Sequence, residues 1–188
     1  MEVFVTLLNS AASAAVNGFF AVLGFLVIIL FLLAVAMYLL QSIGFYKMGK
    51  RAGVSNSWLA FIPPFNGYVM GKILGPERVK FLGQKITSPE LLIPVTPFIM
   101  AFSNSLTASG SALLYLLYFV INLVGVIFLL VCNYQFLKMY KGESAKILFI
   151  LSLVFPIIWP FLIFSMRNAD PVDSVYNYDD YNDYYYTE

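Results

Sequence analysis

The stretch SWLAFIPPFNGYVMGKILG, Ser57 to Gly75, decides the fold, because it is apolar enough to enter a membrane yet is broken at its centre. Pro63 and Pro64 remove two backbone hydrogen-bond donors in mid-segment, and Asn66 follows closely. Such a break suits a segment buried by protein that enters the membrane and returns better than it suits a straight span. We therefore expect a re-entrant hairpin or an interfacial helix pair here. An ordinary kinked span is the alternative.

The composition of the whole chain identifies an integral membrane protein. Its 188 residues are 61% hydrophobic and 11% charged, whereas soluble domains are typically about 45–50% apolar and about 25% charged. Residues 3–46, 91–137 and 147–166 contain no charged side chain. Each of these blocks matches or exceeds the roughly 20 apolar residues that cross a bilayer as a helix.

The first two uncharged blocks are too long for one straight span each. We expect the first to divide at the small and polar string Asn9 to Gly18, so that Phe19 to Leu40 spans and a short helix precedes it. The string could instead form a closely packed helix face. The second block divides at Ser103 to Ser111 into a kinked, proline-containing helix, Leu91 to Phe102, and a clean span, Ala112 to Phe136.

Basic residues predict the orientation, because Lys and Arg prefer the cytoplasmic side of spanning segments. They cluster after the first span, after the opening stretch and after the Ala112 helix. If the opening stretch is re-entrant, all three clusters are cytoplasmic and Ser103 to Ser111 is the external loop. The clusters are Lys47, Lys50 and Arg51; Arg78, Lys80 and Lys85; and Lys138, Lys141 and Lys146.

A weak internal repeat supports this topology. FYKMGK, residues 45–50, recurs as FLKMYK, residues 136–141, and an apolar segment interrupted by proline follows each copy. Broken helices in repeated units form the binding sites of many transporters. The repeat predicts that Ile147 to Phe164 is a second re-entrant segment, although this segment is long enough to span if kinks at Pro156 and Pro160 are tolerated.

The residues from Trp58 to Asn66, the following VMGKILG and the closing FPIIWPFLIF carry a resemblance. They resemble an uncharacterised family of bacterial multi-spanning membrane proteins, a domain of unknown function with the pattern W-x-x-L-I-P-x-Y-N, some of whose members are labelled close to signal peptidase I. The resemblance covers roughly Gly44 to Ser165. Phe65 replaces the usual Tyr, and the loop from Pro76 to Glu90 is longer and more basic than that family implies. The resemblance implies a bacterial cytoplasmic membrane location and no catalytic residues.

The side-chain inventory disfavours an enzyme. The chain has no histidine and one cysteine, Cys132, so we expect no disulfide, no metal and no cofactor. No Ser-Lys or Cys-His arrangement and no acidic pair occurs in the apolar blocks. Signal-peptidase chemistry would require a soluble sheet domain, and no segment here is suited to form one.

The last 20 residues differ from everything before them. Residues 169–188 contain six acids, six tyrosines and no base, and carry −6, whereas residues 1–168 carry +7. We therefore predict two regions, a helical membrane domain over 1–168 and an acidic disordered tail over 169–188. The tyrosines also leave open a partner-docking strip or an intramolecular clasp on the basic loops.

These observations predict an all-α integral membrane protein, a helical bundle with about three full spans plus proline-broken re-entrant or interfacial segments. We expect a non-enzymatic scaffold or accessory protein of the cell membrane that binds lipid, anionic lipid included, and an unidentified protein partner, but not nucleic acid. A small oligomeric transporter or channel subunit is the alternative, and a homo-oligomer remains open in either case. A continuous polar cavity lined by Asn66, Asn122 and Tyr118 would favour transport, whereas a tightly packed apolar bundle would favour a scaffold. The candidate structural or lipid-facing residues are Trp58, Pro63, Pro64, Asn66, Asn122, Lys47, Lys50, Arg51, Lys138 and Lys141.

Overall fold

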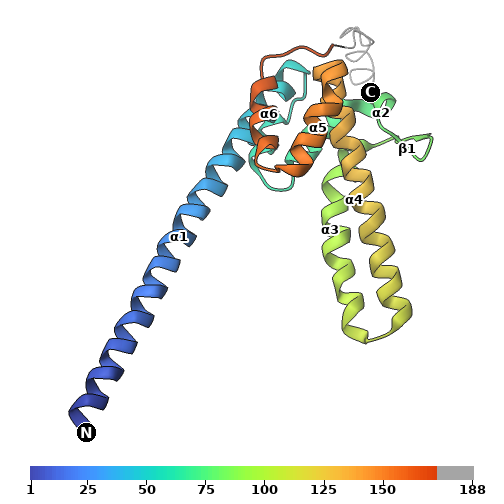
Figure 1. The fold of residues 1–188 in the computed structure, drawn as a ribbon. Coiled ribbons are helices and arrows are strands. Elements are labelled where there is room, and N and C mark those ends of the chain that lie inside the picture. Colours follow the sequence, from blue (N-terminus) through green and yellow to red (C-terminus); the bar gives the residue numbers. More distant parts are fainter. Residues whose placement is uncertain (173–188) are drawn as a thin grey trace. The chain divides into compact units, whose positions relative to one another are not determined.

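The computed structural model describes residues 1–172, apart from the side chains of residues 2–15 and 109. The described chain is helical except for its connections and one very small β-hairpin (Figure 1), which confirms the all-α prediction. In order, the elements are α1 (Glu2–Arg51), η1 (Ser57–Phe61), α2 (Asn66–Arg78), β1 (Lys80–Phe81), β2 (Gln84–Lys85), α3 (Pro89–Ser103), η2 (Asn104–Ser109), α4 (Ala112–Lys141), η3 (Gly142–Ser144), α5 (Ala145–Val154) and α6 (Ile158–Met166).

Three helical stretches are long and apolar enough to cross a membrane, as a multi-pass protein requires. They are Val16–Arg51, Pro89–Ala108 and Ala112–Val154. The chain divides into two compact units, Met1–Tyr38 and the remainder from Leu39 onward. Within the first unit, the described side chains of residues 16–36 are all exposed. An apolar helix of this kind is suited to contact lipid or other membrane helices.

The expected division of the first uncharged block is wrong. α1 is a single helix of 50 residues that continues through Asn17 and Gly18. A glycine or asparagine inside a helix costs at most about 1 kcal/mol, whereas an interrupted backbone exposed to lipid costs several kcal/mol for each unsatisfied group. The continuous helix is therefore favoured, and it extends beyond Leu40 so that its last turns enter the second unit.

α3 and α4 form an antiparallel helical hairpin joined by η2 (Figure 1). Gly125 of α4 permits a close approach, since a Cβ at this position would lie 2.7 Å from the sulfur of Met100. Pro94 and Pro97 both lie inside α3 without ending it. The string that we expected to separate two spans therefore forms the tip of this hairpin, and the tip carries no charge.

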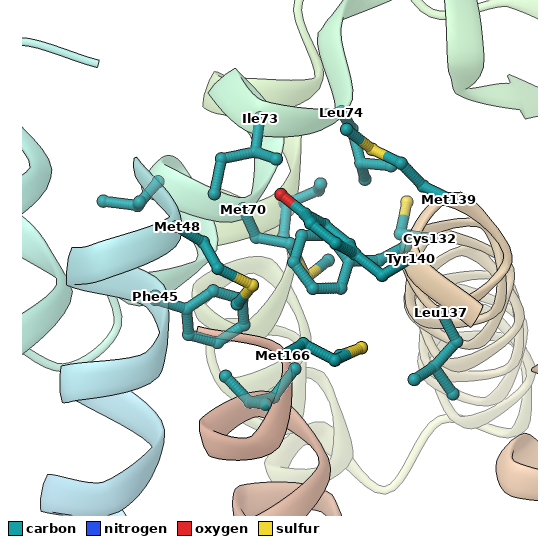
Figure 2. Close-up of a cluster of buried hydrophobic side chains, with 14 of the residues drawn as sticks. Phe45, Met48, Met70, Ile73, Leu74, Cys132, Leu137, Met139, Tyr140 and Met166 are labelled. Carbon is teal, nitrogen blue, oxygen red and sulfur yellow. The ribbon is translucent and has the colours of Figure 1, made fainter. Parts of the chain in front are cut away.

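The core of the second unit lies where the ends of α1, α2, α4 and α6 meet (Figure 2). The Phe45 ring contacts the Phe136 ring at 5.5 Å between centroids, and Phe136 contacts Tyr140 at 5.2 Å. Around these rings lie Met48, Met70, Ile73, Leu74, Cys132, Leu137, Met139 and Met166. This core fastens the proline-broken segments to the ends of the longer helices.

Candidate functional site

The opening stretch begins and ends at one end of the second unit. At its start, a Cβ on Gly49 of α1 would lie 2.8 Å from the Ser57 hydroxyl, so η1 packs directly on the end of α1. At its exit, the Gln135 side-chain amide of α4 donates a 3.0 Å hydrogen bond to the Lys80 carbonyl. Ser57 to Gly75 is therefore a broken segment that returns, with a cis peptide bond between Pro63 and Pro64.

The second proline-broken segment also returns to its starting point. α5 ends at Val154, and α6 begins at Ile158 after the interruption at Pro156. Beyond α6, the Val172 amide donates a 2.8 Å hydrogen bond to the carbonyl of Met139, just before α5 begins. Ten residues of α5 measure about 15 Å, roughly half the hydrocarbon thickness of a bilayer. α5 and α6 therefore form a short helical hairpin.

These two returns gather the basic residues. We call the cations at the ends of α1, α2, α4 and α5 and on the β-hairpin the basic end. The hairpin tip, residues 104–111, is uncharged and lies at the other end of α3 and α4. The basic end comprises Lys47, Lys50, Arg51, Arg78, Lys80, Lys85, Lys138, Lys141 and Lys146.

The first residues of the acidic segment contact this basic end. Arg51 and Asp170 form an ion pair with exposed side chains, and the bond from Val172 to Met139 lies two residues farther on. The chain therefore leaves α6 beside Arg51 and the end of α4. Residues 173–188, which include most of the predicted disordered tail, lie outside the described residues.

One ion pair was not anticipated from the sequence. The Lys72 ammonium lies 3.4 Å from a Glu90 carboxylate oxygen, and the two side chains are only 18% and 19% exposed. Lys72 also lies 5.9 Å from the centre of the Tyr68 ring. The pair joins α2 to the first turn of α3. The available signal was Glu90 itself, an acid directly before a long uncharged block.

Asn122 has a local structural role. Its side-chain amide donates 2.9 Å hydrogen bonds to the Ser103 hydroxyl and to the Tyr118 carbonyl. Ser103 in turn donates to the Met100 carbonyl. This network joins α3 to α4 near the uncharged tip. The cavity described next includes neither Asn122 nor Tyr118 in its lining.

A small cavity lies where the broken segments meet the longer helices. Its volume is about 190 Å³, and Gln41, Asn66 and Asn133 place three carboxamides around it. None of these three side chains hydrogen-bonds to another residue in the described part of the chain. Pro64 and Trp159 also line it, and Asn133 and Trp159 line a neighbouring cavity of about 290 Å³.

The predicted candidates therefore separate into three places. Pro64 and Asn66 line the cavity, Trp58 and Pro63 are exposed outside it, and Asn122 lies in the α3–α4 hairpin. The five predicted cations all lie at the basic end: Lys47, Lys50, Arg51, Lys138 and Lys141. The sequence analysis did not identify Gln41 and Asn133, because the neighbours of an amide in an apolar helix depend on how the helices pack.

Among the described residues, no group of three or more His, Cys, Asp or Glu side chains is placed to hold a metal ion. Cys132 is buried in the core. Comparison of the chain with protein-family models, curated proteins and solved structures finds no match.

Proposed function

We propose that this chain is a non-enzymatic membrane scaffold or accessory protein that binds anionic phospholipid through its basic end. The supporting observation is that nine basic residues from three separate stretches of sequence gather around the same helix ends. Two broken segments produce this arrangement by returning instead of spanning. A protein partner would bind on the same side, next to a lipid surface that the basic end has enriched in negative charge.

The expected interaction is electrostatic. A Lys or Arg near an anionic leaflet contributes about 1 kcal/mol, and salt screens the attraction over about 8 Å at physiological ionic strength. Lys47 and Lys138 are exposed, as this role requires, and the Lys50 ammonium lies 5.1 Å from the Tyr46 ring centre. In the positive-inside arrangement the basic end is cytoplasmic. The resemblance described above points in turn to a bacterial cytoplasmic membrane.

The test is lipid selection by the purified protein. Wild-type protein is reconstituted into vesicles of phosphatidylglycerol and phosphatidylcholine in equal amounts, extracted mildly, and analysed for the lipids that remain bound. We expect enrichment of phosphatidylglycerol that decreases as salt increases. A variant with Lys47, Lys50, Lys138 and Lys141 all changed to Gln should lose most of the enrichment.

Glu143→Gln provides a matched control at the same end. It changes a carboxylate to an amide without removing a cation, so enrichment should persist or increase slightly. Equal retention of the two lipids by wild-type protein, or enrichment that the fourfold variant leaves unchanged, would refute the proposal.

The carboxamide cavity favours a second function, the passage of a small neutral polar solute. Amides without partners inside an apolar body are costly unless water or a solute bonds to them, and broken helices often surround transporter sites. Proteoliposomes should then swell faster in urea or glycerol than protein-free vesicles do. Asn66→Leu and Asn133→Leu should abolish the difference. Swelling at the protein-free rate would exclude this function.

A further inference from the structure

An apolar groove of about 380 Å³ lies between the β-hairpin and the α3–α4 pair. Phe81 and Ile86 line the end next to the β-hairpin, and Leu92 and Met100 line it along α3. The lining residues of α4 are Val120, Ile121, Val124, Gly125 and Phe128. Val120 and Phe128 are eight residues apart, so the groove extends for about 12 Å along α4. Half of a bilayer's hydrocarbon core is about 15 Å thick.

The depth of the groove can be placed from the hairpin itself. If the uncharged tip lies at one membrane surface, about 20 residues of α4 bring the chain to the other surface near Cys132. The groove then extends from near the membrane centre toward the basic end. At that depth, lipid acyl chains surround the groove and water does not.

The mouth of the groove carries paired positive charge. In the β-hairpin, Lys80 lies directly opposite Lys85, and Phe81 lies opposite Gln84. Like charges in a cross-strand pair repel, so an anion between or beside them stabilises the hairpin. Glu77 already pairs with Lys85. Because that pair is exposed and Lys80 adds a second cation, positive charge remains in excess.

The hairpin is held in place over the groove. Leu82 and Gly83 both have positive φ, 50° and 82°, as a tight two-residue turn requires. Phe81 contacts Phe128 edge to face at 5.4 Å, and Gln135 binds the Lys80 carbonyl. Lys80 and Lys85 directly precede Phe81 and Ile86 in the sequence, and these two apolar residues line the groove. The two positive charges are therefore held beside the groove.

We propose that this groove binds one anionic phospholipid, with an acyl chain between α3 and α4 and its phosphate at Lys80 and Lys85. This inference rests on the proposed function, and it converts diffuse attraction at the basic end into a defined site. The apolar groove matches the acyl chain of such a lipid, and the two lysines match its phosphate. A lipid without net charge would leave the positive charge of the lysine pair uncompensated.

The test reads the groove directly by fluorescence. Phe81→Trp is introduced in a Trp58→Phe/Trp159→Phe background, and quenching is measured in vesicles of brominated-chain phosphatidylglycerol or phosphatidylcholine. Val126→Trp is the matched control, because Val126 lies at similar depth on α4 but does not line the groove. We expect the binding of phosphatidylglycerol relative to phosphatidylcholine to be about fivefold stronger at Phe81→Trp than at Val126→Trp.

Two further changes separate the parts of the site. Lys80→Gln/Lys85→Gln should bring the preference at Phe81→Trp down to the Val126→Trp value. Val124→Phe, which fills the groove from α4, should reduce quenching by both lipids there. Equal preference at the two tryptophans, or a preference that survives the lysine changes, overturns this site. If the lipids retained by wild-type protein are still enriched in phosphatidylglycerol, the proposed function stands without it.

Discussion

The two proline-broken segments have the same topology but different surroundings. In the first segment, α2 is packed closely, and its Gly71 faces the backbone of Pro89 and Glu90. In the second, α5 and α6 leave Ile147, Ile150 and Phe161 exposed. The first segment is thus held by packing and an ion pair within the protein, whereas the second leaves much of its apolar surface exposed.

The largest effect is expected from closing the space at Gly71. A Cβ there would lie 2.7 Å from the Pro89 carbonyl carbon and closer still to Glu90, and a rigid backbone cannot move aside easily. Gly71→Leu should therefore destabilise the second unit by about 3 kcal/mol or more. The check is the thermal aggregation midpoint in detergent. Gly24→Leu, where an added Cβ meets nothing within 4 Å, should leave the midpoint unchanged.

The second segment should respond less strongly to the same kind of change. A Cβ on Gly44 would meet the Ile163 side chain at 2.7 Å and the Ile163 backbone at 2.9 Å. Because α6 leaves apolar side chains such as Phe161 exposed, it can shift outward, and Gly44→Leu should lower stability by about 1–2 kcal/mol. A loss as large as that of Gly71→Leu would show that both segments are equally fixed and would remove the contrast.

The Lys72–Glu90 pair should matter only to the first segment. Removing one partner from a buried pair costs about 3–5 kcal/mol, and the partial exposure of these two side chains reduces the expected cost to about 1–3 kcal/mol. Lys72→Met and Glu90→Gln, with the double variant, form a cycle measured by thermal stability. Glu77→Gln, which breaks the exposed pair with Lys85, should cost less than about 1 kcal/mol. Additive effects at Lys72 and Glu90 would contradict the coupling.

The smallest effect is expected where the chain leaves the second segment. Asp170→Asn removes a charge and also releases Arg51 from this ion pair, so phosphatidylglycerol enrichment should rise by about twofold at low salt and less at high salt. Glu143→Gln alters the charge equally without releasing Arg51 and should give a smaller rise. If the two variants behave alike, the contact between Asp170 and Arg51 has no part in lipid binding.

The sequence predicted the breaks better than it predicted what holds them. Prolines at 63, 64 and 156 act locally, by removing donors, so the interruptions could be located without a structure. The continuity of α1 through Asn17 and Gly18 could not be predicted in this way. The local helix propensity of these residues favours a break, whereas the cost of breaking the helix comes from the surrounding lipid. The small hairpin around Leu82 and Gly83 also lacks a strong turn signature.

The candidate sites show the same division. The cations of the basic end could be identified from the sequence as three clusters, since each cluster follows an apolar stretch. By contrast, the partnership of Lys72 with Glu90 depends on the close approach at Gly71, and the cavity amides at Gln41 and Asn133 depend on the packing of several helices. Such contacts between distant parts of the sequence are set by tertiary packing, which a single sequence does not reveal.

The central claim, that both broken segments return to the side from which they enter, is tested most directly by cysteine labelling in a Cys132→Ala background. Single substitutions Ala108→Cys, Ser55→Cys, Ser144→Cys and Asn168→Cys, all at exposed positions, are treated in intact cells with a membrane-impermeant maleimide. We predict that Ala108→Cys is labelled directly, and that the other three are labelled only after permeabilisation. Labelling of Asn168→Cys from outside while Ser144→Cys stays protected would show that α5 and α6 together span the membrane. Labelling of Ser144→Cys from outside while Ser55→Cys and Ala108→Cys stay protected would show that the opening segment spans.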